Sequence, residues 1–145
     1  MRIDILTLFP EMLKAAIATS IVKRAQDGGQ VEIQVHDIRD WADNKHRKVD
    51  HRPYGGGPGM VMMCQPLHDA VQEVERQLNS STVRIHFTPQ GEVLKQERVE
   101  QLACETHLLL IAGHYEGIDE RVIETLDPLE LSIGDYVLSG GEIPA

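Results

Sequence analysis

The segment Gly113-His-Tyr-Glu-Gly-Ile-Asp-Glu-Arg121 combines residue types that could bind a small ligand. A glycine ends an apolar run, and a helix is expected four residues later, an arrangement that usually cradles a phosphate. Acidic side chains, however, crowd the start of that helix and the next loop: Glu116, Asp119, Glu120, Asp135 and Glu142. Carboxylates repel a diphosphate and favour a cation, so S-adenosylmethionine, with its sulfonium and ammonium groups, fits better than NAD or ATP. A second interpretation stays open, in which the carboxylates only complement the helix dipole.

The segment Ser132-Ile-Gly-Asp-Tyr-Val-Leu-Ser-Gly-Gly-Glu-Ile-Pro144 could complete such a pocket, because glycines flank its apolar centre. Exposed main-chain groups could read the edge of an adenine, while Ile133, Tyr136 and Leu138 supply apolar walls. An ordinary strand with a tight turn at each end explains the same pattern equally well. Composition alone does not separate these two interpretations.

A basic patch lies in the first half of the chain. The net charge is −9, but residues 1–60 carry nine Lys and Arg against eight Asp and Glu, and residues 61–145 carry five against fifteen. The patch contains Lys45, His46, Arg47, Lys48 and Arg52. It predicts contacts to nucleic-acid phosphates, with Tyr54 stacking on an unpaired base, unless it is simply a solvated face. His46, Asp50 and His51 match no zinc spacing, and no cysteine lies nearby, so no metal site is expected.

The run Gly55-Gly-Gly-Pro-Gly-Met60 follows the basic patch. It is not a phosphate-binding loop, because no Lys-Ser/Thr pair follows, and it lacks the third glycine of the dinucleotide fingerprint. A turn-rich linker is one interpretation. The other is that the glycines let the backbone approach a flat ligand or an RNA chain closely.

Length and composition bound the class of protein. The chain has 145 residues, 41% hydrophobic and 26% charged, as expected of one globular domain. Cys64 and Cys104 show no disulfide framework, and no apolar run approaches the roughly 20 residues that span a bilayer. Arg2 and Asp4 lie where a signal peptide would need other residues. We therefore expect a reduced, cytoplasmic, single-domain protein.

The elements that must position these segments alternate along the chain. Strands are expected at Arg2–Leu8, Val31–Val35, Val83–Thr88, His107–Ala112 and Leu129–Ile133. Helices are expected from Pro10, at Ile21–Gln26, from Pro66 to Leu78, at Lys95–Glu105 and at Gly117–Leu126, with a long loop over Asp37–Gln65 and a turn at Pro89–Gly91.

This alternation predicts an α/β fold with a mainly parallel sheet flanked by helices. Ligands of such sheets bind outside the carboxyl ends of the strands. Three segments follow strands and should therefore meet: Thr88–Gly91, Gly113–Gly117 and Ile133–Gly141.

Four motifs in order carry a family resemblance. Leu8-Phe-Pro-Glu-Met12, Arg52-Pro-Tyr-Gly-Gly-Gly-Pro-Gly-Met60, Gly113–Arg121 and Ser132–Glu142 resemble the bacterial tRNA (guanine-N1)-methyltransferase family, TrmD, over Met1 to Ala145. The resemblance implies a SPOUT-type α/β fold with a C-terminal trefoil knot, and a homodimer with active sites between subunits. The implied reaction transfers the methyl group of S-adenosylmethionine to N1 of a tRNA guanine next to the anticodon.

Residue roles follow from the motifs that match. The resemblance implies a methyl-donor pocket lined by Pro89, Gly113, Tyr115, Ile133, Gly134, Asp135, Tyr136, Val137, Leu138, Gly140, Gly141 and Pro144. Glu116 would lie near the reacting centre in a supporting catalytic role. The tRNA surface would comprise Lys45, His46, Arg47, Lys48, Arg52 and Tyr54, with the glycine run beside the target guanine. Mg²⁺ assistance stays open, and no membrane or DNA partner is expected.

The resemblance also implies parts beyond Ala145. The family continues with a helix that completes the knot, a linker, and a helical domain that grips tRNA. An aspartate, the general base that removes the N1 proton, and an arginine that supports the base fall there. Residues 1–145 are therefore expected to be a truncated N-terminal domain with an incomplete knot, inefficient on its own. His114 stands where some relatives should have arginine, with a modest effect expected.

Two other functions remain as hypotheses. One is a non-catalytic RNA- or ligand-binding module, natural in its shortened form, because the basic patch is present while the expected base is not. The other is a nucleotide-phosphate-dependent enzyme. The acidic helix start and the failed phosphate-loop match disfavour this last class.

Overall fold

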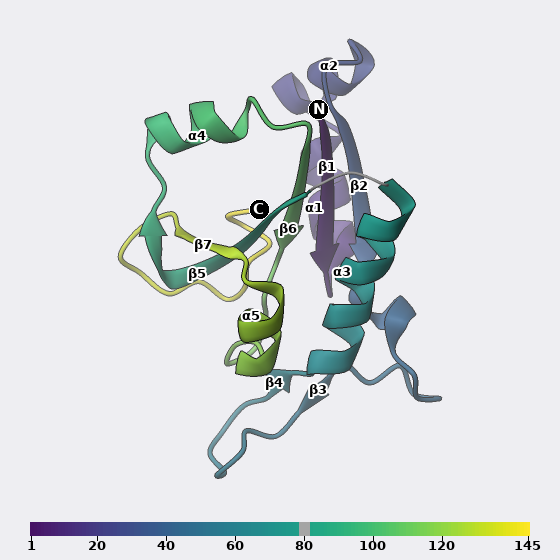
Figure 1. The fold of residues 1–145 in the computed structure, drawn as a ribbon, viewed down its shortest axis with the longest axis vertical. Coiled ribbons are helices and arrows are strands. Elements are labelled where there is room, and N and C mark those ends of the chain that lie inside the picture. The colour runs from purple at the N-terminus through teal and green to yellow at the C-terminus, as the bar shows by residue number, and fades with distance from the viewer. Residues whose placement is uncertain (79–81) are drawn as a thin grey trace.

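A five-stranded parallel sheet forms the centre of the protein in the computed structural model, which describes residues 1–78 and 82–145 (Figure 1). The strands lie in the order β2-β1-β6-β5-β7, and every pairing between neighbours is parallel. Their bounds are β1 (Arg2–Thr7), β2 (Glu32–Asp37), β5 (Val83–Val93), β6 (His107–Ile111) and β7 (Leu129–Ser132). The predicted α/β fold with a mainly parallel sheet is confirmed.

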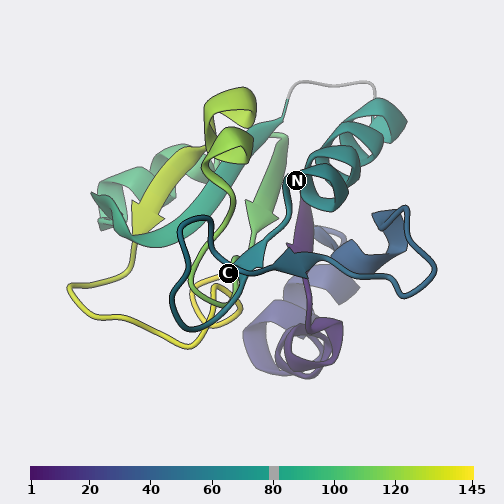
Figure 2. The same cartoon turned by 90° about the horizontal axis from the view of Figure 1, so that it is seen from below.

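Helices cover both faces of this sheet (Figures 1 and 2). They are α1 (Pro10–Ile17), α2 (Ser20–Asp27), η1 (a 3₁₀ turn, Ile38–Trp41), α3 (Cys64–Leu78), α4 (Gln96–Leu102) and α5 (Glu120–Leu126). Local signals set several ends. Pro10 occupies the first turn of α1, and Gly28 caps the carboxyl end of α2.

Two hydrophobic cores lie on opposite faces, and β6 contributes to both. All five residues of β6 are buried. Leu109 and Ile111 join the core beneath α3 and α5, whereas Leu108 and Leu110 join the core that contains Leu13 of α1. This alternation follows from the two-residue period of a strand. Each such side chain contributes roughly 1.5–3 kcal/mol on burial.

The turn predicted at Pro89–Gly91 is wrong, because β5 continues through it to Val93. Both Phe87 and Glu92 pair with Leu131 of β7, so the intervening residues bulge out of the ladder. The backbones meet closely there. A Cβ on Gly91 would lie 2.5 Å from the carbonyl carbon of Glu130, which explains a glycine at this point.

Two further boundaries differ from the predictions. The last helix begins at Glu120, not Gly117, because Asp119 caps it by accepting a hydrogen bond from the Arg121 N–H. The predicted loop over Asp37–Gln65 contains η1 and two short antiparallel strands, β3 (Asp50–His51) and β4 (Val61–Met62). The Met62 N–H donates to the Gly117 carbonyl at 2.9 Å, so β4 is joined to the loop before α5.

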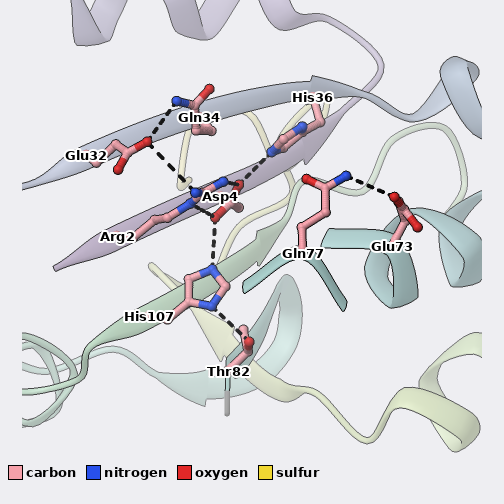
Figure 3. A network of polar contacts seen from close by, with 9 residues as sticks. All are labelled: Arg2, Asp4, Glu32, Gln34, His36, Glu73, Gln77, Thr82 and His107. Atoms are coloured by element: carbon pink, nitrogen blue, oxygen red, sulfur yellow. Dashed lines mark hydrogen bonds and ion pairs between the residues drawn. The ribbon is translucent and has the colours of Figure 1, made fainter. Parts of the chain in front are cut away.

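A buried polar network surrounds Asp4 of β1 (Figure 3). The Asp4 side chain is fully buried, receives two hydrogen bonds from the Arg2 guanidinium, and lies 2.6 and 2.9 Å from Nε2 of His36 and His107. Burial by itself would raise the pKa of Asp4. The hydrogen bonds from His36, Arg2 and His107 outweigh it and hold the pKa well below its usual range. The network ties the three adjacent strands β2, β1 and β6 together.

Residues 133–145 return to the loop that follows β6. The Gly141 N–H donates to the Gly113 carbonyl at 2.6 Å, and the Ala145 N–H donates to the Gly141 carbonyl at 3.1 Å. The C-terminal segment therefore packs beside a central strand. The trefoil knot and the place of residues 1–145 as the N-terminal domain of a longer protein stay predictions.

Candidate functional site

The three segments predicted to meet line one cleft, which lies at the carboxyl ends of β6 and β7 and against β5. Its volume is about 330 Å³, within the range of small-ligand sites. Residues 86–90 come from β5, residues 113–118 follow β6, and residues 130–134 and 136–141 come from β7 and the segment after it. The predicted convergence of the three segments is confirmed, although residues 86–90 lie within β5, which ends only at Val93.

Every residue of the predicted methyl-donor pocket lines this cleft except Asp135. Asp135 is exposed because the chain turns there. The Tyr136 N–H donates to the Gly134 carbonyl, and the Tyr136 ring folds back so far that a Cβ on Gly134 would lie 2.2 Å from it. Asp135 is therefore absent from the cleft lining, and its contact with the ligand stays a prediction. The ligand contacts of the other pocket residues stay predictions.

Main-chain atoms of two loops approach each other at the floor of the cleft. A Cβ on Gly141 would lie 2.7 Å from the Gly113 nitrogen and 2.8 Å from Cα of Ala112. No side chain fits in that space without moving the backbone. The paired glycines of the motif are thus explained by close packing of one loop on the other.

The charge of the cleft is one-sided. The carboxylate residues Glu116, Glu120 and Glu130 line it, and no Lys or Arg is among its lining residues in the part of the chain that the structure describes. Charges of one sign in a partly enclosed cleft raise the local concentration of the opposite charge. The arrangement favours a cationic ligand over a phosphate.

His86 lines the cleft and was missed from the sequence. It is 8% exposed, and its Nδ1 lies 3.2 Å from Oε1 of Glu130. Burial lowers the pKa of His86, although Glu130 acts in the opposite direction. The lowered pKa favours a neutral imidazole at the cleft, and a neutral ring does not repel a cationic ligand. The only sequence signal was its place two residues before the strand-end segment at Thr88.

Glu116 joins the cleft to the glycine run. Its N–H donates to the Met60 carbonyl at 3.0 Å, and its side chain lies over Gly59, where a Cβ would come within 2.4 Å of Glu116 Cγ. Gly59 also has a φ of +81°, which favours glycine. The contact holds one end of the run against the rim of the cleft.

The predicted RNA-binding residues lie outside the cleft, four of them before β3 and two between β3 and the glycine run. Exposed side chains in this group are Lys45, His46, Arg47, Lys48, Arg52 and Tyr54. Arg47 is already engaged, since it forms an ion pair with Asp40 and donates to the Arg39 carbonyl. Their role in binding RNA stays a prediction.

Tyr54 is supported from the start of α5. Its side chain is 78% exposed, and the Arg121 guanidinium lies 5.8 Å from the ring centroid and donates to its hydroxyl at 3.3 Å. The His51 ring lies 4.9 Å away, centroid to centroid. The Arg121 guanidinium in turn donates hydrogen bonds to the Asp119 carboxylate, and these bonds lower the pKa of Asp119 to about 2. Asp119 is thus both a helix cap and an anchor.

Within residues 1–78 and 82–145, no three His, Cys, Asp or Glu side chains are grouped to hold a metal ion. In the same ranges no helix combines the length and apolar character needed to cross a bilayer.

Comparison with known proteins assigns the family. The family model described as "tRNA (Guanine-1)-methyltransferase TrmD" matches residues 1–145, the whole chain. The chain belongs to the TrmD family. The resemblance seen in the four motifs is confirmed.

Curated members of the TrmD family align with the whole length of this chain. Proteins named tRNA (guanine-N(1)-)-methyltransferase are 50% identical in Ruminiclostridium cellulolyticum, 55% in Chloroflexus aurantiacus and 51% in Bacillus subtilis. Each match covers 100% of this chain and 62%, 57% and 60% of the respective relative. The chain thus spans little more than half the length of the curated relatives.

Proposed function

We propose that this chain supplies the S-adenosylmethionine pocket and part of the tRNA surface of a cytoplasmic tRNA (guanine-N1)-methyltransferase. The observation that carries the proposal is the one-sided charge of the cleft, with Glu116, Glu120 and Glu130 and no Lys or Arg among its described lining residues. Membership of the TrmD family supports the same ligand. A phosphate-bearing cofactor would need the opposite charge.

The residues of the cleft fit this ligand on two counts. Ile133, Tyr136 and Leu138 supply apolar walls for an adenine, beside main-chain groups of the same segment. The carboxylates would hold the ammonium and sulfonium groups at the rim. When bound, S-adenosylmethionine supplies an electrophilic methyl group.

The tRNA would approach over the glycine run and the basic patch. Glu116 contacts both the run and the cleft, so it stands between the proposed methyl-donor pocket and the proposed base site. This position is consistent with the auxiliary catalytic role predicted for Glu116. Guanine N1 must lose its proton for methyl transfer. Residues outside 1–145 would supply the general base, the completed knot and the domain that grips tRNA. The active unit would be a homodimer. Mg²⁺ assistance stays open.

Calorimetric titration of the chain with S-adenosylmethionine tests the pocket. Gly113→Trp should abolish binding, because a Cβ there already lies 3.2 Å from Nε2 of His86 and 3.3 Å from Cδ1 of Ile118. The rest of the indole must then fill the cleft. Ala18→Trp, at an exposed position outside the cleft, is the matched control and should leave affinity unchanged.

Thermal melts of both variants establish that they fold. Unchanged affinity in folded Gly113→Trp would refute the pocket assignment. Tight binding of ATP in place of S-adenosylmethionine would instead support the nucleotide-dependent class.

A further inference from the structure

Glu142 is a buried carboxyl group to which the pocket assignment gives no role. Its side chain is only 2% exposed, and the residue does not line the cleft. Oε1 accepts a hydrogen bond from the Thr7 hydroxyl at 2.9 Å. Oε2 lies 3.4 Å from Nδ1 of His114. A buried carboxyl group without partners is costly, so these two contacts are what permit its position.

The hydrogen bond from Thr7 has a defined direction. The Phe9 N–H donates to the Thr7 hydroxyl oxygen at 2.8 Å, so the single hydrogen of that hydroxyl is left for Glu142. Thr7 ends β1, and the Ala112 N–H donates to the Leu6 carbonyl just before it. Glu142 is therefore bound to the rigid end of a central strand.

His114 holds the other side of the carboxyl group. Its ring packs on Phe9 with centroids 4.7 Å apart, and the backbone N–H of His114 donates to the Met62 sulfur. These contacts orient Nδ1 toward Glu142. The modest effect expected for the histidine at position 114 stays a prediction.

Gly140, the neighbour of Gly141 at the cleft floor, lies directly against this cluster. A Cβ on Gly140 would come within 2.3 Å of Oε2 of Glu142 and 2.4 Å of Nδ1 of His114. Gly140 and His114 also form an antiparallel bridge, and Gly141 donates to the Gly113 carbonyl. The path of residues 139–144 at the cleft is thus set from behind by Glu142.

We propose that Glu142 is a positioning residue. It ties the segment after β7 to the end of β1 and to the loop after β6, and so fixes the glycines that form the cleft floor. Its effect on S-adenosylmethionine rests on the proposed function. The anchoring itself needs no ligand, so the two can fail separately.

Hydrogen exchange of the ligand-free chain, followed by NMR, tests the anchoring. Glu142→Ala and Thr7→Val should each speed exchange of the Gly141 and Ala145 amides by about tenfold or more, because local opening becomes easier. The Ala112 amide in the sheet should not change. Thr7→Ser keeps the hydroxyl and should behave as the unmodified chain. If Glu142→Ala does not fold, the Thr7 pair still decides the question.

Titration with S-adenosylmethionine then tests positioning. Both anchoring variants should weaken binding by about tenfold, and the double variant should be no weaker than Glu142→Ala alone, since both act through one contact. Thr7→Ser should restore the affinity lost in Thr7→Val. Unchanged exchange at Gly141 and Ala145 would overturn the proposal, as would additive losses of affinity. If the unmodified chain binds no S-adenosylmethionine, the proposed function fails and the exchange data alone decide the anchoring.

Discussion

Asp4→Asn should lower the free energy of unfolding by about 3 kcal/mol or more, because it removes one charge of a buried set of ion pairs and leaves the other groups unpaired. The size follows from the partners. The Asp4 side chain is fully buried, and His107 beside it is 3% exposed, so that contact is hardly screened by water. Arg2 is 29% exposed and contributes less. An amide keeps the shape, but it carries no charge and brings an N–H to face the existing donors.

Urea unfolding followed by circular dichroism measures the loss. With a slope of about 2 kcal/mol per molar urea, the midpoint should fall by about 1.5 M. Asp27→Asn is the matched control, because Asp27 forms an exposed ion pair with Lys23, and such a pair contributes under about 0.5 kcal/mol. A midpoint for Asp4→Asn within the range of this control would refute the reasoning.

The pH dependence of the same variant has a fixed sign. The pKa of Asp4 in the folded chain lies below its value in the unfolded chain, which is about 4. The contribution of Asp4 to the free energy of unfolding is therefore complete above that unfolded-state pKa and is lost as the pH falls toward the folded-state pKa. The difference between the unmodified chain and Asp4→Asn should therefore be constant near neutral pH and shrink below about pH 4. A difference that grows on acidification would contradict the ionised state inferred for Asp4.

Two further predictions concern the surface. In binding to an anticodon stem-loop RNA, Lys48→Ala should reduce the magnitude of the slope of log affinity against log salt by about 0.7–0.9. Arg47→Ala should change that slope less, because Arg47 already pairs with a carboxylate. Fluorescence anisotropy over a salt series measures both slopes, and equal slopes for the two variants would contradict the prediction. The exposed thiol of Cys104 should react with a disulfide reagent faster than Cys64, whose pKa is raised by burial. A Cys64→Ser variant assigns the two phases, and equal rates would count against the burial argument.

Much of the site was predictable because its motifs follow strands. Three segments expected to follow strands predicted the cleft, and the structure brings all three together. The prediction failed where backbone packing decides. The bulge at Pro89–Gly91 has the sequence of a turn, and only the pairing of β5 with β7 shows that the strand continues.

Sequence by itself determined the order of elements, the parallel sheet and the TrmD family, because hydrophobic periods and motifs are local properties of the chain. Only the tertiary structure decided which distant polar groups meet. Thr7 and Glu142 are 135 residues apart, and nothing local to either marks it as the partner of the other. His86 likewise becomes a cleft residue only when β5 lies beside β7. Burial and partner choice depend on the packed sheet, and those two properties set the chemistry of the cleft.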